Sequence, residues 1–480
     1  MTQRQKRPNV VWIVTDHQAQ ANRTVRPGQR PLQDYFAKTG VIFERAYTAL
    51  PICSPARASM ITGLFPHAHG LTENDGRFGG RAELDHSDWM VQQAFLDEGY
   101  RCGWFGKWHL SQSHSALDFG FEGYSLSGYG YPYGSKPYLD YLRRNLLPDP
   151  IVEIELPGES GVKAGTQLNL VNESSWFDYE AGSAILKAPA ETHEAFFLTD
   201  LASTWINDLD EEPFFLRLDP WGPHPPYIVD ETFASLPETD FSANFNYALS
   251  GRPEHHKDYL AYWTQTLQFD EAQWALMAQR AMDHGKLIET ALLKFVEALE
   301  EKGLGENTLF VFCADHGDAV GSNGGVSNKG GLMVEETMQI PLAMKGPGLA
   351  VEARTELCSN LDLAPTLLDF CKIQTNEELQ GSSLYPLLHG SKEWHRPGIM
   401  AQHYGLHVPI TQRAFYAGDW KYVRQPNGFE ELYNLAEDPG ELTNLARSTD
   451  HSTKRNELRC LLTDEMKRVG DSPTDFAKPV

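Results

Sequence analysis

Four apolar runs, far apart in the chain, each lead into residues that can bind metals, bind anions or move protons. The runs lie within residues 10–15, 99–110, 211–227 and 307–318. The polar residues that follow them are Asp16, Lys107, His109, His224, Asp315 and His316. Helical patterns lie between the runs, and strands that alternate with helices predict a mainly parallel sheet covered on both faces. Ligands bind at the carboxyl ends of such strands, so we expect these residues to meet at one edge of the sheet.

The expected organisation is an α/β fold in two parts. Residues 1–390 would form a large, mostly parallel mixed sheet sandwiched by helices, because the strand-and-helix rhythm runs through this region. Residues 391–480 turn to short strand-like pieces, such as "RAFYAGDWKYV", which predict a small α+β subdomain with an antiparallel sheet. Residues 124–195 break the rhythm, being rich in Tyr, Gly and Pro and then irregular and acidic. A loop this long in a compact domain is usually functional or disordered, and we interpret it as a substrate-facing insertion.

Charge and composition restrict the partners of the chain. The formal net charge of −24 argues against nucleic acid or an anionic membrane surface as a partner. No apolar run approaches the ~20 residues that span a bilayer. The run at 10–15 is too short for the apolar part of a signal peptide, so a cytoplasmic protein is expected. An anionic substrate would need positive charge gathered locally, because the field of the whole chain would repel it. Oligomeric state is open, and a homo-oligomer is one of the options.

A divalent metal is one interpretation of the acidic strand ends. Asp16, Asp315 and His316 supply hard oxygen ligands and an imidazole, and His17 is a further candidate ligand. Taken singly, an Asp after a strand more often begins a turn or caps a helix. Six cysteines are scattered without close pairs, which favours neither a disulfide framework nor a zinc knuckle.

Four further residues suit anion binding or proton transfer. Lys107 and His109 are two residues apart, so in an extended segment both point to the same side. A cation beside an imidazole can bind an anion and move a proton. Lys329, in "SNKGG", is a loop lysine of the same kind, and His224 lies between prolines that restrict its backbone in "GPHPPY". Each of these residues is equally at home in an ordinary loop.

Cys53 opens the stretch "CSPARASMITGLFPHAHG", which has the pattern of a helix start. Pro55 fits the first helical turn, where its missing N–H costs little. Arg57 lies four residues after Cys53 and would project from the same helix face. A thiol at a helix N-terminus beside a guanidinium lies in an electropositive site that attracts anions. A buried structural cysteine is the common alternative, and a cysteine hydrolase with a partner histidine is another.

Taken together and in order, these motifs resemble those of the sulfatase family, within the alkaline-phosphatase-like superfamily. The family's signature is seen in C-x-P-x-R, its first strand in "PNVVWIVTD", and its Lys-x-His motif in "GYRCGWFGKWHL". Its histidine loop, second metal motif and anion-binding lysine are seen in "GPHPPY", "FCADHGD" and "NKGG". The C-terminal landmarks "SNLDLAPTLLDF" and "ELYNLAEDPGELTNLA" follow. A lone motif of this kind is weak, whereas this many in the family's order is specific.

The resemblance implies a role for each matching residue. A maturation enzyme would oxidise Cys53 to formylglycine, whose hydrate is the nucleophile and one oxygen of which also meets the metal. Arg57 would steady the hydrate, Lys107 and Lys329 would neutralise the transferred group, and His109 would help the covalent intermediate collapse. His224, aided by Lys329, would protonate the leaving alcohol. The metal ligands would be Asp16, Asp315 and His316, and Asn74 would contact the substrate.

The departure from the family lies at position 17. Many members have a second Asp there, and this chain has His17, which leaves the fourth protein ligand open. Ca²⁺ is the first expectation for an oxygen-rich cage, and Mn²⁺ is the alternative because a second imidazole shifts the preference toward it.

The implied reaction is hydrolysis of an organic sulfate monoester with release of inorganic sulfate. The substrate would be a carbohydrate, aryl or small alkyl ester. A ring could stack on tyrosines of the insertion, namely Tyr124, Tyr129, Tyr131 and Tyr133, although tyrosines in a long loop are as often packing residues. A phosphonate or phosphate ester hydrolase of the same superfamily is the alternative, although such enzymes tend to lack the Lys-x-His pair that "GKWHL" retains. A non-catalytic relative is disfavoured, since none of the motif residues is lost.

Overall fold

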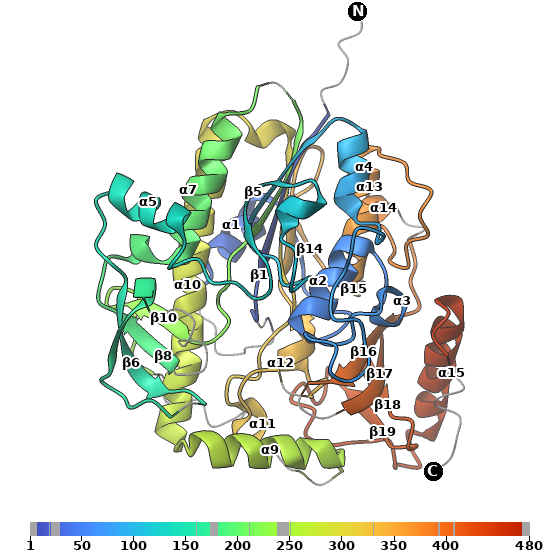
Figure 1. Cartoon of the computed structure of the whole chain (residues 1–480). Helices are drawn as coiled ribbons and strands as arrows, with labels where there is room; N and C mark the ends of the chain where they lie inside the picture. Colours follow the sequence, from blue (N-terminus) through green and yellow to red (C-terminus); the bar gives the residue numbers. More distant parts are fainter. Residues whose placement is uncertain are drawn as a thin grey trace, which may run out of the picture.

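An eight-stranded mixed sheet forms the centre of the molecule (Figure 1). The computed structural model describes residues 7–18, 20, 29–159, 161–172, 181–210, 212–237, 249, 251–329, 331–391, 394–406 and 409–472. The strand order is β14 (Glu352–Arg354), β2 (Val41–Phe43), β13 (Leu342–Lys345), β11 (Thr308–Ala314), β1 (Asn9–Thr15), β9 (Phe214–Asp219), β4 (Arg101–Lys107) and β5 (Glu122–Leu126). The five strands from β11 to β5 are parallel, whereas β13 runs antiparallel to both of its neighbours. The mostly parallel mixed sheet expected from the sequence is confirmed.

Helices cover both faces of this sheet because β1 and its neighbours are apolar on both sides. Val10, Trp12 and Val14 of β1 join one core, and Val11 and Ile13 join the other. The first core is closed by α2 (Cys53–Thr62), α4 (Val91–Asp97) and α13 (Leu363–Cys371). The second is closed by α1 (Pro31–Thr39), α7 (Glu194–Asn207) and α10 (Glu271–Glu301).

The segment that interrupts the sequence rhythm has more regular structure than its composition suggested. It contains α5 (Lys136–Arg144), β6 (Ile151–Pro157), β7 (Gln167–Asn169) and β8 (Ala181–Leu186). Together with β10 (Tyr227–Asp230), these three strands form a four-stranded sheet in the order β10-β8-β6-β7. Residues 160 and 173–180 of the predicted insertion lie outside the described residues. The insertion is therefore a small layer beside α10 rather than one long loop.

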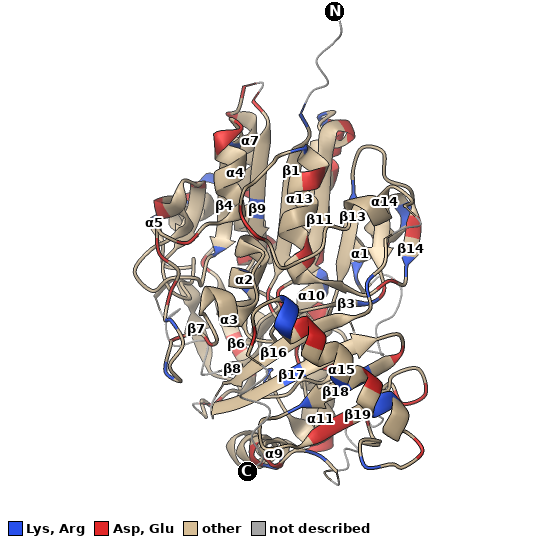
Figure 2. Ribbon diagram, turned by 90° about the vertical axis from the view of Figure 1, so that its right-hand side faces the viewer, with Lys and Arg blue, Asp and Glu red and all other residues tan. Residues whose placement is uncertain are grey.

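The C-terminal part contains the predicted antiparallel sheet. Its strands pair in chain order and are β16 (Ile399–Gly405), β17 (Pro409–Ala417), β18 (Trp420–Arg424) and β19 (Glu430–Asn434). The last helix, α15 (Ser452–Arg468), packs Leu458, Leu462 and Met466 against this sheet. Charged residues of both signs lie along α15, whereas β1 and β11 carry none (Figure 2). The exact domain boundary near residue 390 stays a prediction.

Short elements complete the described chain. A three-stranded sheet joins β12 (Gln339–Ile340), β3 (Ala46–Tyr47) and β15 (Cys358–Ser359). The other α-helices are α3 (Pro66–His69), α9 (Glu254–Leu267), α11 (Ser322–Gly325), α12 (Glu335–Met338) and α14 (Tyr385–Leu388). The 3-10 turns are Ala116–Phe119, Ala190–Thr192, Gly305–Asn307 and Asn360–Asp362. Throughout the described ranges, every helix is too short or too polar to cross a membrane.

Candidate active site

The strand ends and the start of α2 meet at one point, as the sequence pattern predicts. Asp16 follows β1, Lys107 ends β4 and Asp315 follows β11. In the sheet, β1 pairs with β11 and is separated from β4 by β9 alone. Helix α2 begins at Cys53 and ends before Gly63, whose φ of 69° lies in the left-handed region that ends helices. The N-terminus of α2, the positive end of its dipole, therefore lies at the carboxyl edge of the sheet, where Cys53 contacts His316.

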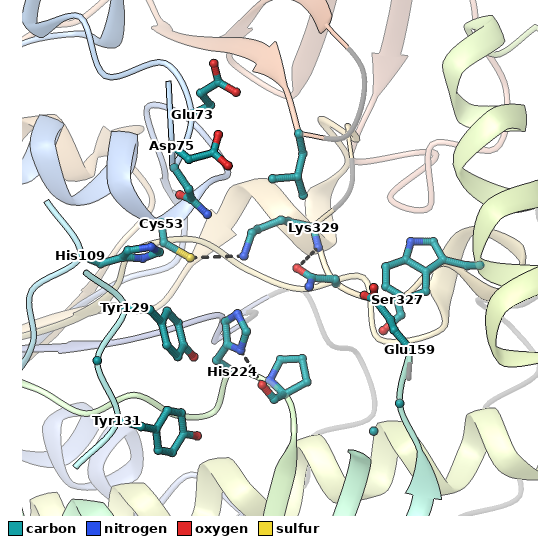
Figure 3. Close-up of a pocket in the computed structure, with 18 of the residues that line it drawn as sticks. Cys53, Glu73, Asp75, His109, Tyr129, Tyr131, Glu159, His224, Ser327 and Lys329 are labelled. Carbon is teal, nitrogen blue, oxygen red and sulfur yellow. Dashed lines mark hydrogen bonds between the residues drawn. The ribbon is translucent and has the colours of Figure 1, made fainter. Parts of the chain in front are cut away.

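Cys53 lies among basic and imidazole groups. Its Sγ is 3.2 Å from Lys329 Nζ and 3.2 Å from His316 Nε2, and the residue is 1% exposed. It lines a pocket of about 580 Å³ together with His109, His224 and Lys329 (Figure 3). Asn74 also lines this pocket, and its Oδ1 accepts a hydrogen bond of 3.0 Å from the backbone N–H of Ser54. Four residues singled out in the sequence therefore line the pocket beside Cys53 at the start of α2: Asn74, His109, His224 and Lys329.

Arg57 lies about one helical turn after Cys53 on α2, and carboxylates hold its guanidinium in place. Its Nε donates to Asp315 Oδ2 at 2.9 Å and its Nη1 donates to Asp219 Oδ2 at 2.8 Å. A third carboxylate, Asp16, has Oδ1 at 3.8 Å from Nη2. The sequence placed Arg57 beside Cys53; the geometry shows it chiefly as the cation that fixes the acidic strand ends.

Four side chains could hold a metal ion together. One ligand atom from each of Asp16, His17, Cys53 and His316 lies within 4.8 Å of the others, and all four residues are buried. Within the described structure, Asp16 Oδ1 is buried without a hydrogen-bond partner, which fits an oxygen meant for a cation. The donor set of carboxylate, imidazole and a position 53 side chain suits a divalent ion.

Asp315, the fifth predicted metal ligand, lies beside this group with its carboxylate engaged. Oδ2 accepts from Arg57, and Oδ1 accepts from the backbone N–H groups of His17 at 3.2 Å and His316 at 2.8 Å. Oδ1 is nevertheless 3.8 Å from His316 Nε2, at the border of the four-residue group. A carboxylate oxygen has two lone pairs, so a bound metal could share it.

The ring of His17 is fixed by an acidic residue that sequence reasoning did not single out. His17 Nδ1 is 3.2 Å from Asp318 Oδ2, which also accepts from the hydroxyl of Tyr227 at 2.8 Å. The Nδ1–H of His17 donates a hydrogen bond to the Asp318 carboxylate, so Nε2 presents its lone pair to the site, where the Lys329 ammonium contacts it. His17 adopts a φ of 66°, a conformation uncommon outside glycine. Asp318 lies within the motif "ADHGD", but the spacing of that motif alone did not indicate a role for this residue.

Burial and neighbouring charges set the protonation of the site. Burial by itself would raise the pKa of Asp16, but the nearby cations of Lys107 and Arg57 hold that pKa well below its usual range. Lys107 forms an ion pair with Asp16. Burial and nearby cations hold the pKa of His224 well below its usual range, so its imidazole is neutral. His224 Nδ1 lies 2.5 Å from the carbonyl oxygen of Pro225, which assigns the proton to Nδ1.

Comparison with known proteins identifies the family. The sulfatase family model matches residues 8–373, and a second model, N-sulphoglucosamine sulphohydrolase, C-terminal, matches residues 327–468. The chain belongs to the sulfatase family. It is thus a hydrolase that acts on sulfate esters.

Individual relatives can be aligned with nearly the whole chain. Arylsulfatase K of Canis lupus familiaris is 26% identical, covering 97% of this chain and 83% of the relative. A structure solved in complex with its substrate, D-glucosamine-2-N,6-O-disulfate, is 19% identical and covers 98% of this sulfatase and 99% of that chain, with a TM-score of 0.72. A phosphonate monoester hydrolase of Silicibacter pomeroyi is 18% identical, with coverages of 96% and 95% and a TM-score of 0.74. The fold is therefore shared by enzymes of both specificities.

Aromatic and acidic side chains form the walls of the pocket in this sulfatase. Tyr129, Tyr131 and Glu159 come from the predicted insertion, and Glu73 and Asp75 face them across the pocket (Figure 3). The Lys107 ammonium lies 4.2 Å from the ring centre of Tyr129. The other two tyrosines named above do not line the pocket. The hydroxyl of Tyr124 donates to Ser135 at 2.8 Å, and Tyr133 is 1% exposed and packs in the core.

Two further buried residues support the site of the sulfatase without having been singled out in the sequence. Asp219 ends β9 and accepts hydrogen bonds from two arginines, Arg57 and Arg217. Glu194 begins α7 and accepts two backbone hydrogen bonds from the segment that precedes His224. Neither belongs to a short motif, so no spacing signal could have found them.

Proposed function

We propose that this sulfatase releases inorganic sulfate from an organic sulfate monoester by means of a formylglycine produced from Cys53. The observation that carries the proposal is the position of Cys53 at the first residue of α2, with Sγ 3.2 Å from both Lys329 Nζ and His316 Nε2. Conversion of Cys53 would require a formylglycine-generating maturation enzyme as a partner. The hydrated aldehyde supplies one hydroxyl to attack sulfur and a second through which sulfate is expelled.

The remaining groups would divide the chemistry among themselves. Lys107 and Lys329 would offset the negative charge of the sulfuryl oxygens, which answers the need for local positive charge in a chain with net charge −24. Arg57 would keep Asp315 and Asp219 oriented through its hydrogen bonds of 2.9 and 2.8 Å. Lys329 and Asn74, which both line the pocket with Cys53, would contact the substrate.

Two histidines are proposed to handle protons. His224 carries its proton on Nδ1 in the geometry described above, and Nε2 is the ring nitrogen left for the pocket. His224 would protonate the leaving alcohol once its pKa is raised by the anionic substrate, with Lys329 assisting. His109 also lines the pocket, and within the described residues its Nδ1 has no hydrogen-bond partner. It would help the second half of the reaction by taking a proton from position 53.

A divalent metal would be held by Asp16, Asp315 and His316, with His17 and the position 53 side chain completing the set. The metal would supply charge to a sulfate oxygen and to the nucleophile. Ca²⁺ is proposed as the ion, and Mn²⁺ is the alternative because the paired imidazoles of His17 and His316 shift the preference toward it. Metal analysis of the purified protein tests this, and His17→Asp should move the preference toward Ca²⁺.

The leaving group is proposed to be a carbohydrate or aryl alcohol. Support comes from Tyr129 and Tyr131, whose rings lie 5.9 Å apart in a stacked arrangement on the pocket wall. Aromatic faces bind sugar and aryl rings, and neighbouring carboxylates such as Glu73 can accept hydroxyl hydrogen bonds.

The decisive experiment compares sulfate release from sulfated sugars, an aryl sulfate and a small alkyl sulfate with turnover of a phenylphosphonate ester. Peptide mass spectrometry at position 53 should find a species about 18 Da lighter than cysteine, since sulfur is replaced in the aldehyde. Cys53→Ala should abolish turnover. The likeness to the phosphonate monoester hydrolase keeps that activity as the second candidate, and a large preference for the phosphonate would establish it instead.

A further inference from the structure

Glu194 is a buried carboxyl group behind the segment that carries His224. It is 1% exposed and is the first residue of α7. Its Oε1 accepts hydrogen bonds from two consecutive backbone N–H groups, those of Trp221 at 3.1 Å and Gly222 at 3.3 Å. Its Oε2 is buried and, in the described part of the chain, has no hydrogen-bond partner. One side chain therefore ties down two adjacent peptide groups that would otherwise be buried donors without acceptors.

The tied peptides connect directly to the active site. The carbonyl oxygen of Gly222 accepts from the backbone N–H of Asp16 at 3.1 Å. The indole N–H of Trp221 donates to the carbonyl oxygen of Tyr129 at 2.8 Å. His224 follows two residues later. The Trp221–Gly222 segment therefore contacts Asp16 at the end of β1 and Tyr129 on the pocket wall, and it leads directly to His224.

A pair of histidines, His193 and His284, lies beside the Trp221–Gly222 segment, next to α10. His193 Nδ1 accepts from the backbone N–H of Ala195 at 3.2 Å, so its Nε2–H donates to His284 Nε2 at 2.9 Å. A methyl group at Gly222 would come within 2.4 Å of Ile288 Cδ1 and 2.8 Å of His284 Cε1. The backbone therefore has no room to retreat toward α10, and Glu194 fixes it from the other side.

We infer that Glu194 is a positioning residue of this sulfatase, which sets the Trp221–Gly222 backbone so that His224 reaches the oxygen of the leaving alcohol. The inference rests on the role proposed for His224. Burial raises the pKa of Glu194 to about 8, so the group is protonated and uncharged near neutral pH. Glutamine would keep the accepting oxygen in place, whereas alanine would leave both N–H groups without an acceptor.

The test uses the full-length protein with two aryl sulfates, 4-nitrophenyl sulfate and phenyl sulfate, whose leaving groups differ in basicity. Proton donation contributes 10²–10⁴-fold to a reaction with a basic leaving group and little to one with an acidic leaving group. Glu194→Ala should therefore lower kcat for phenyl sulfate about tenfold or more beyond its effect on 4-nitrophenyl sulfate. KM should stay within about threefold, and Glu194→Gln should restore the ratio.

His224→Ala is the reference and Glu191→Ala the matched control. Glu191 is an exposed glutamate three residues before Glu194, and its replacement should change neither rate. Should Glu194→Ala fail to fold, Gly222→Ala displaces the same backbone from the opposite side and should give the same leaving-group dependence. An equal loss on both esters, or no rescue by glutamine, would overturn the inference. If His224→Ala itself shows no leaving-group dependence, the proposed role of His224 fails and this inference fails with it.

Discussion

Replacement of Asp219 tests the buried charge cluster on which the site is built. Asp219 accepts from Arg57 Nη1 at 2.8 Å, from Arg217 Nε at 2.9 Å and from Arg217 Nη2 at 2.6 Å. All three side chains are fully buried. The Arg217 guanidinium also lies 4.1 Å from the ring centre of Trp12 and 4.5 Å from that of Trp104, so it has no route to solvent.

The size of the expected destabilisation depends on which carboxylate partners each arginine retains after the replacement. In Asp219→Ala, Arg57 retains its hydrogen bond to Asp315, but Arg217 loses its carboxylate partner and stays buried between two indoles. Removing one partner of a buried ion pair typically costs about 3–5 kcal/mol, because an uncompensated charge remains. Asp219→Asn keeps an accepting oxygen and should cost roughly half as much. Activity should fall most in Asp219→Ala, where Arg57 is no longer held from two sides.

The assay is urea unfolding followed by tryptophan fluorescence, with the midpoint and slope compared among variants. Asp140→Asn is the matched control, because Asp140 is 40% exposed in its ion pairs with Lys136 and Arg143. Its loss should change the free energy of unfolding by no more than about 0.5 kcal/mol. If Asp219→Ala destabilises by less than about 1 kcal/mol at an unchanged slope, the reasoning about an uncompensated Arg217 is refuted.

Three further outcomes are expected. Burial holds the pKa of His69 and His193 at about 3, so the unfolded chain binds more protons between about pH 6.5 and 3. The unfolding midpoint should therefore fall as the pH drops through that window, and a constant midpoint from pH 7 to 4 would contradict this. Chelation of the metal should lower the unfolding temperature, because a ligand at about 100 times its Kd stabilises the folded state by about 2.7 kcal/mol; an unchanged temperature after metal is shown to be removed would refute the assigned site. Tyr131 lines the pocket, so Tyr131→Ala should raise KM several-fold in steady-state kinetics with little loss of stability. Tyr133 is buried in the core, so Tyr133→Ala should mainly destabilise the protein, by about 3 kcal/mol in urea unfolding. Equal effects of the two changes on KM would contradict this assignment of Tyr131 to the pocket and Tyr133 to the core.

Much of the architecture could be predicted from local patterns. The runs before Asp16, Lys107 and Asp315 are strands, and Cys53 opens a helix, because apolar period, proline position and glycine termination act over a few residues. The convergence of these strand ends followed from the general geometry of parallel sheets. The segment 124–195 was harder, because β6, β7 and β8 pair with one another and with β10, and such pairing is not encoded in composition.

The sequence by itself determined which chemistry the chain can perform, since the identity and order of the motif residues are properties of the chain and point to one family. Tertiary structure alone decided how those residues are used. Arg57 turns to Asp219 and Asp315, His17 is oriented by Asp318, and Glu194 holds the backbone before His224. These contacts join residues up to about 300 positions apart. Their energies depend on burial and on the direction of each side chain, and both arise only when the sheet and its covering helices assemble.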